Sequence, residues 1–92
     1  MKSVIQSEKE CFLCGITREL HCHHVFGGVG NRKMSERYGM KVWLCREHHT
    51  GNAGVHQNRD LDLIVKEVAQ TNFEKKVGSR EEFMKIFGRN YL

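Results

Sequence analysis

The architecture of this chain is clearest in one stretch, Lys41-Val42-Trp43-Leu44-Cys45-Arg46-Glu47-His48-His49. Its first half is β-branched and aromatic and predicts a short strand over 41–45. The strand delivers Cys45 to a turn in which His48 follows after two residues. Turns that present two soft or borderline ligands at this spacing are typical of zinc sites. The stretch therefore predicts half of a structural zinc site at the end of a strand.

A second ligand pair lies upstream, in Cys11-Phe12-Leu13-Cys14-Gly15. The run has the form of a zinc knuckle, in which Gly15 supplies backbone freedom just after the turn. Structural zinc takes four ligands, usually as two pairs, so we expect a structural Zn2+ bound by Cys11, Cys14, Cys45 and His48. His49 is an alternative fourth ligand. The alternative to zinc is a redox or idle cysteine pair with Cys45 buried in its strand.

The remaining thiol is Cys22, which alternates with His21 and His23. Alternation along a strand predicts that Cys22 faces the core.

The length of 92 residues allows one small domain. Such a domain buries only about 60–65% of the surface of its unfolded chain, so a metal or a partner is expected to help stabilise it. No apolar run approaches the ~20 residues that span a bilayer, and residues 1–8 lack the apolar core of a signal peptide. We therefore expect a cytoplasmic protein with no membrane partner, in which cysteines bind metal rather than form disulfides.

Local patterns predict the remaining elements of the front half. Residues 19–26 can alternate faces as a strand before the glycines of 27–30 interrupt it. A helix is expected from Asn31, as its N-cap, to Tyr38, with Gly39 ending it.

Two amphipathic helices are expected in the back half. Apolar residues recur at three and four positions from Asp60 to about Lys76, and Gly78 is expected to end that helix. Residues 79–82 have capping-box spacing and predict a further helix that stops at Gly88. The aromatic Tyr91 of the tail is expected to pack back onto the body.

Charge and histidine are concentrated in the front half. The formal net charge is +4, and residues 1–58 carry three of these four excess positive charges together with all six histidines. This asymmetry is a mild indication of a polyanionic partner.

Five histidines remain outside the predicted zinc site, and four of them form a second candidate group: His23, His24, His49 and His56. A hydrolytic metal site needs a few imidazole or carboxylate ligands, open positions for water and phosphate, and a base. Neighbouring residues of a strand point to opposite sides, so one histidine of the pair His23-His24 can hold an ion while the other reaches the water. The alternative is that these histidines are polar surface residues or extra zinc ligands.

Three runs carry a resemblance to a known family: Leu20-His21-Cys22-His23-His24-Val25-Phe26, Val42-Trp43-Leu44-Cys45-Arg46-Glu47-His48-His49 and Gly54-Val55-His56. They resemble the HNH endonucleases of the zinc-knuckle, ββα-metal type. The whole chain, including residues 31–33 and 86–92, is also similar to small phage-encoded HNH proteins related to recombination-enhancement nucleases.

The resemblance implies a small zinc-stabilised α+β fold, a ββα-metal domain with two additional C-terminal helices. It implies one domain over residues 1–92, with a metal core at 11–56 and a helical scaffold at 60–92. In the family, the first residue of the His-His pair binds the catalytic ion and the second is the general base. This implies His24 as the base and His23 and His49 as ligands of a catalytic divalent cation, Mg2+, Mn2+ or a similar ion. His56 would be a further ligand or a phosphate contact. The resemblance also implies Cys11, Cys14, Cys45 and His48 as the structural zinc ligands.

One position departs from the family pattern. The asparagine that usually holds the loop bearing the base is replaced by Met40. We expect the loop to be held otherwise, with Asn52 and Asn58 as candidates.

The expected function is that of a metal-dependent DNA endonuclease of low sequence specificity. Its products would carry 5′ phosphates, and His24 would take a proton from the attacking water. The basic residues nearest the site in sequence are expected to track the phosphate backbone, although each alone is more often a solvated surface charge: Arg32, Lys33, Arg37 and Arg46.

Two other functions remain open. The chain can be a catalytically silent zinc module that binds nucleic acid or a phage or host recombination or packaging protein. It can also be a small zinc-stabilised adaptor that uses the helix over 61–76. A phage origin would place it in the cytoplasm of the bacterial host cell, and the sequence does not indicate an oligomeric state.

Overall fold

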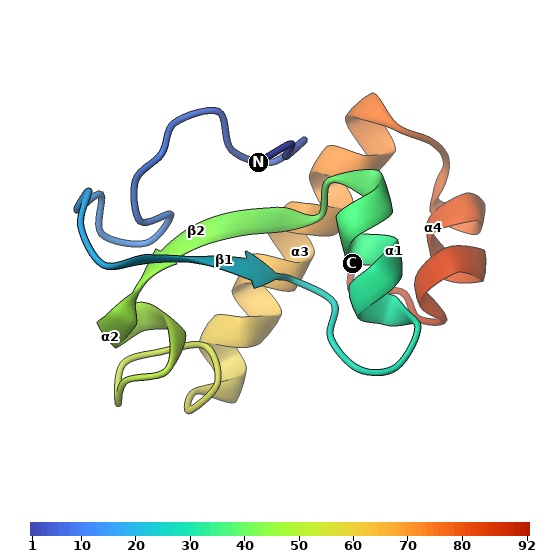
Figure 1. Cartoon of the computed structure of the whole chain (residues 1–92). Coiled ribbons are helices and arrows are strands. Elements are labelled where there is room, and N and C mark those ends of the chain that lie inside the picture. Colours follow the sequence, from blue (N-terminus) through green and yellow to red (C-terminus); the bar gives the residue numbers. More distant parts are fainter.

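The computed structural model describes all 92 residues as a small α+β fold (Figure 1). Its elements are, in chain order, β1 (Leu20–His24), α1 (Asn31–Tyr38), β2 (Lys41–Cys45), α2 (Arg46–His49), α3 (Arg59–Lys76) and α4 (Arg80–Phe87). The predicted α+β class is confirmed, and so are the second strand and the long C-terminal helices. No helix is both long enough and apolar enough to cross a lipid bilayer.

The two strands form an antiparallel sheet, and candidate functional residues lie at both of its ends. Leu20 pairs with Cys45 at one end, and His24 pairs with Lys41 at the other. Because α1 connects the strands at the second end, it lies beside His24. The turn that carries His48 and His49 lies at the first end, as the single-turn helix α2.

The N-terminal segment completes the outer edge of β2. The Trp43 N–H donates to Oε1 of Gln6 at 2.8 Å, and the Trp43 carbonyl accepts from the Phe12 N–H at 2.8 Å. These bonds satisfy backbone groups that an edge strand would otherwise leave open. They also bring the Cys11–Cys14 turn alongside the end of β2.

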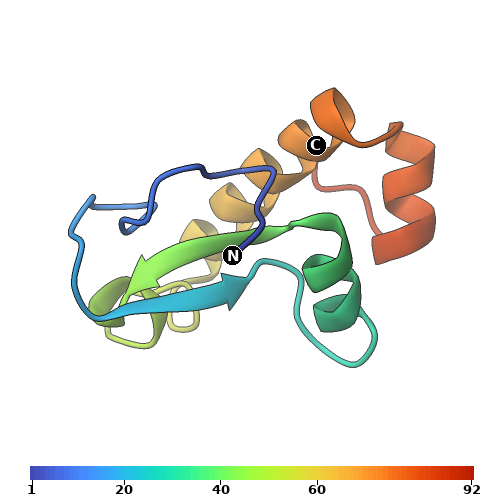
Figure 2. The same ribbon diagram turned by 45° about the horizontal axis from the view of Figure 1, so that its top comes forward.

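The long helix α3 runs behind the sheet in both views, and α4 packs beside its C-terminal half (Figures 1 and 2). Asn58 caps α3 by accepting the Leu61 N–H, and the predicted capping box of Ser79 and Glu82 opens α4. Gly88 ends α4 in a left-handed conformation that favours glycine. The capping box and Gly88 were predicted from the sequence, whereas the Asn58 cap was not.

An aromatic cluster joins the helices to the end of β1. Phe26, which follows β1, packs against both Phe83 and Phe87 of α4, with ring centroids 5.2 and 4.5 Å away. Tyr91 stacks on the same ring at 5.4 Å, which confirms the expected packing of the tail. The core therefore anchors the residues immediately after His24 to the C-terminal scaffold.

Two local predictions are wrong. Asn31 does not cap α1, because Gly30 at φ +87° occupies the cap position and the Asn31 side chain instead donates to the Phe87 carbonyl. Cys22 does not face the core: it is exposed, with its sulfur 3.3 Å from Sδ of Met1, whereas His23 is buried. The face of β1 that carries His23 lies against His49 and His56, and Cys22 on the opposite face contacts Met1, the first residue of the chain.

Candidate metal centres and the adjoining groove

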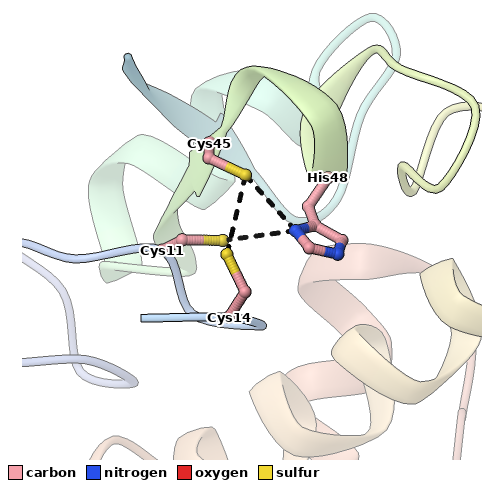
Figure 3. A group of neighbouring side chains, drawn as sticks. All are labelled: Cys11, Cys14, Cys45 and His48. Atoms are coloured by element: carbon pink, nitrogen blue, oxygen red, sulfur yellow. Dashed lines mark hydrogen bonds between the residues drawn. The ribbon is translucent and has the colours of Figure 1, made fainter. Parts of the chain in front are cut away.

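The predicted zinc ligands lie together in a group that could hold a metal ion, which we call the Cys3His cluster: Cys11, Cys14, Cys45 and His48 (Figure 3). Their ligand atoms all lie within 4.8 Å of one another. Sγ of Cys14 is 3.8 Å from Sγ of Cys45, and Nδ1 of His48 is 3.2 Å from Sγ of Cys45 and 3.8 Å from Sγ of Cys11. Tetrahedral zinc, with Zn–S of about 2.3 Å and Zn–N of about 2.0 Å, separates its ligands by roughly 3.6–3.8 Å. The cluster therefore has the donor set and size that a tetrahedral metal ion requires.

The backbone of the Cys11–Cys14 turn favours metal binding. The Gly15 N–H donates to the Cys11 carbonyl at 2.8 Å, and Gly15 adopts φ +80°. Burial opposes ionisation of the Cys11 thiol, but N–H groups of Cys45, Leu13 and Cys14 donate to it and lower its pKa to about 6. A thiolate is the form that binds metal.

The second group is the three-histidine cluster: His23 from β1, His49 from α2 and His56 from the loop before α3. Their ligand nitrogens also lie within 4.8 Å of one another, and Nε2 of His49 is 3.2 Å from Nε2 of His56. The structure thus places His48 with the cysteines and His49 with the histidines, and it places His56 among candidate ligands.

His56 reaches His49 because the intervening loop folds back onto α2. The Val55 N–H donates to the His48 carbonyl at 2.9 Å. A Cβ at Gly54 would lie 2.8 Å from the His49 carbonyl oxygen, so only glycine allows this close approach. The six residues between His49 and His56 therefore form a compact turn that brings the two histidines together.

The buried His23 fits a metal ligand better than a satisfied core histidine. Its Nε2 is buried and has no hydrogen-bond partner. Burial, together with the nearby His49 and His56, lowers the pKa of His23 to about 3, and burial and the imidazoles of His56 and His21 also lower the pKa of His49. Both rings are therefore held neutral, as metal ligands must be. An orphaned imidazole nitrogen facing two further imidazoles fits a divalent cation.

His21 is a further contact of this cluster that the sequence interpretation missed. Its Nδ1 lies 2.9 Å from Nδ1 of His49, on the side of that ring away from His56. Metal-binding histidines usually use their second nitrogen for such a hydrogen bond, which fixes the tautomer and the ring orientation. The alternation of His21 with His23 on β1 was the available signal.

His24, the expected general base, is half-buried and lies at the end of β1. Its Nε2 is 3.4 Å from Oε2 of Glu36, and the same carboxylate oxygen is 2.5 Å from Nζ of the buried Lys41. The hydrogen bond from Lys41 lowers the pKa of Glu36 and keeps its carboxylate charged. Glu36, two positions before the end of α1, carried no motif by which the sequence alone could identify it.

The loop after His24 is held by Ser35. The Ser35 hydroxyl accepts from the Phe26 N–H at 3.1 Å and donates to the Phe26 carbonyl at 2.9 Å, and Ser35 is completely buried. Asn58, one of the two expected candidates, caps α3 instead, and Asn52 is exposed. Met40 fills the core and its carbonyl accepts the Val25 N–H at 3.0 Å.

Three of the four predicted phosphate contacts lie in one groove. Arg32, Lys33 and Arg37 of α1 line a groove of about 730 Å³ that also includes His24. Arg46 does not join them, because it lies beyond the opposite end of the sheet, where its guanidinium is 3.9 Å from Glu19. Proximity in sequence to His49 was therefore a poor guide to the position of Arg46.

No family model matches this chain, and neither a curated protein nor a solved structure matches it. The fold and the sites define its class by themselves: a small α+β protein with a Cys3His cluster that could hold a metal ion and a three-histidine cluster beside a basic groove.

Proposed function

We propose that this protein is a metal-dependent endonuclease of the HNH type that hydrolyses DNA phosphodiester bonds with low intrinsic sequence specificity. One observation carries the proposal. His24 adjoins a buried, partnerless His23 of the three-histidine cluster, and both residues line one open groove with His56. A general base beside neutral metal ligands and an open approach is the arrangement that hydrolytic metal sites require.

The three-histidine cluster would hold the catalytic divalent cation, Mg2+, Mn2+ or a similar ion. Such an ion, when bound, stabilises negative charge on the phosphate and on the leaving 3′ oxygen. His23 and His49 are kept neutral for binding by burial and by the neighbouring imidazoles. His21 orients the His49 ring through its second nitrogen.

His24 would accept the proton of the water that attacks phosphorus. Glu36 lies against its ring and orients it, in the way that a carboxylate orients a catalytic imidazole. The bond from phosphorus to the 3′ oxygen breaks and that oxygen takes a proton from solvent, which leaves a 5′ phosphate and a 3′ hydroxyl. The loop after His24 is kept rigid by Ser35 and by the aromatic packing of Phe26.

The Cys3His cluster would bind a structural Zn2+. It joins the knuckle to the end of β2 and to α2, and α2 carries His49. In this proposal zinc contributes to folding and holds the catalytic cluster in place, without a role in the reaction.

The proposal is tested by nicking of supercoiled plasmid with Mg2+, Mn2+, Ni2+ or no added ion. Zinc-loaded wild-type protein, His24→Ala and the matched control Cys22→Ala, an exposed neighbour on β1, are compared. We expect ion-dependent nicking by the wild type and the control, and a loss of about 10²-fold or more in His24→Ala, the usual scale for a general base.

Absence of cutting by the zinc-loaded wild type, on duplex and on single-stranded DNA with every ion, would overturn the proposal. It would favour the silent zinc module that binds nucleic acid or a recombination or packaging protein.

A further inference from the structure

Two grooves of the surface meet at His24. The first lies between the glycine loop after β1 and α1, and has a volume of about 730 Å³. The second lies between the end of β1 and the start of α3, and has a volume of about 450 Å³. His24 is the residue that lines both. Both volumes fall in the range of about 300–1,000 Å³ that small ligands occupy, so each groove has room for a group of nucleotide size.

Each groove carries its own cations. Arg32, Lys33 and Arg37 line the first, and all three are exposed. Arg59 and Lys66 of α3 line the second, on the other side of His24. The sequence interpretation did not connect these two residues of α3 with the site.

The acidic residues of the grooves compensate only part of this positive charge. Glu36 is engaged by the buried Lys41, which does not line the first groove. In the second groove Asp62 pairs with Lys66 at 2.8 Å, in an i, i+4 contact that offsets one of the two positive charges there. Arg59 is exposed and forms no ion pair. Each groove therefore keeps an excess of positive charge that favours a phosphate.

We propose that the two grooves form one continuous binding path for a DNA strand, with the phosphates on either side of His24 bound by separate sets of cations. A single phosphate or mononucleotide would fill one groove and leave the other set unused. A linear polyanion that crosses His24 uses both sets. The inference rests on the proposed endonuclease function, and it adds Arg59 and Lys66 as contacts on the α3 side.

Binding is tested first, without any added divalent ion, because it does not depend on cleavage. Three double variants each remove two positive charges: Arg32→Gln/Lys33→Gln in the first groove, Arg59→Gln/Lys66→Gln in the second, and Lys75→Gln/Lys85→Gln as the control. The control lysines lie on α3 and α4 outside both grooves. Circular dichroism and zinc content establish that each variant is folded.

The affinity of each protein for a 30-base-pair duplex is measured by fluorescence anisotropy at several salt concentrations. Each phosphate contact contributes about 0.9 to the slope of log affinity against log salt. We expect each groove variant to lower the magnitude of that slope by about 1 to 2, and the control to change it by less than about 0.5.

Cleavage then tests whether the path is two-sided. On duplexes labelled at the 5′ or the 3′ end, the wild type is expected to avoid bonds near both ends, because both grooves must be filled. Where the cations of one groove are removed, DNA that fills this groove gains little extra affinity. Bonds closer to the corresponding end of the duplex should then be cut, and those near the other end should still be avoided. The two groove variants should shift the cuts toward opposite ends, and the control should not shift them.

The outcomes separate this inference from the endonuclease proposal. Slopes that fall in both groove variants, with no cleavage by any protein, would support the path and overturn the endonuclease. If the protein cleaves DNA but the salt slope falls in only one groove variant, or falls equally in the control, the proposed path is wrong. The endonuclease proposal would still hold in that case. Cuts that shift toward the same end in both variants would also overturn it.

Discussion

Ser35 illustrates how much one buried hydroxyl contributes to the site. It bonds both the N–H and the carbonyl of Phe26, two residues after His24. We expect Ser35→Ala to lower the free energy of unfolding by about 1–3 kcal/mol, because it leaves buried backbone groups without partners. Urea denaturation measures this loss, and hydrogen exchange at the Phe26 amide should become faster.

The matched control for that change is Ser79→Ala, which removes the cap of α4. It should cost a similar amount, about 1 kcal/mol, and leave exchange at the Phe26 amide unaltered relative to global stability. Equal exchange at Phe26 in both variants would mean that Ser35 does not hold this loop.

His21 gives a second prediction for a single residue, on the premise that the three-histidine cluster holds a divalent ion. Outer hydrogen bonds to metal-binding histidines are typically worth 10–100-fold in metal affinity or activity. We expect His21→Ala to weaken Mn2+ binding to the zinc-loaded protein by about 10-fold, measured by calorimetry. His21→Gln should lose less, because its amide oxygen can accept the His49 Nδ1 proton. The same Mn2+ affinity in wild type and His21→Ala would contradict this role.

At the scale of elements, Glu74 and Arg80 join α3 to the start of α4. The Arg80 guanidinium donates to Glu74 from Nε at 3.1 Å, and the Gln70 amide donates to it at 2.9 Å. These donors lower the pKa of Glu74 in the folded state, Arg80 having the larger effect. The stabilisation is therefore present above the unfolded-state pKa, near 4.5, and is lost as the pH falls through the lower folded-state value.

We expect Glu74→Gln to be less stable than the wild type at neutral pH, and the difference to disappear on acidification. Urea unfolding measures the difference from pH 7 down to the lowest pH at which both proteins keep their metal and their folded circular dichroism spectrum, because loss of the metal would itself unfold them. Glu67→Gln, an exposed carboxylate of α3 outside any ion pair, is the control. A difference that does not narrow as the pH is lowered within this range would show that the charge of Glu74 is not what joins these helices.

For the whole molecule, the metal of the Cys3His cluster is expected to decide whether the chain folds. Structural zinc contributes about 10–16 kcal/mol in zinc-finger peptides, as much as the entire stability of an ordinary domain. The core here comprises 13 buried apolar residues, two of which are the metal-site cysteines Cys11 and Cys45. We expect Cys14→Ala to be unfolded by circular dichroism, and a zinc chelator to unfold the wild type reversibly.

Cys22→Ala is the control, because Cys22 is also exposed but lies outside the cluster. It should keep its zinc and its unfolding midpoint. A Cys14→Ala protein with a wild-type spectrum and midpoint would mean that the apolar core suffices without metal.

Helix positions were predicted well because their signals are local. The apolar spacing over 60–76 and the capping box at 79–82 act within a few residues, so contacts from elsewhere are not needed to recognise them. The candidate ligand pairs were recognisable for the same reason, since each pair lies on one short turn. The orientation of Cys22 was not, because alternation shows which residues share a face but not which face the rest of the molecule covers.

The amino-acid sequence by itself determined the α+β class, the two C-terminal helices and the three cysteines of the Cys3His cluster, because propensity, capping and ligand spacing are short-range properties. Only the tertiary structure decided which histidine joins which cluster, that Ser35 holds the loop beyond His24, that Glu36 lies against His24, and that Arg59 faces it from α3. These relations depend on strand register and on the packing of α1 and α3. Both arise from burial of the whole apolar core, and no segment specifies them alone.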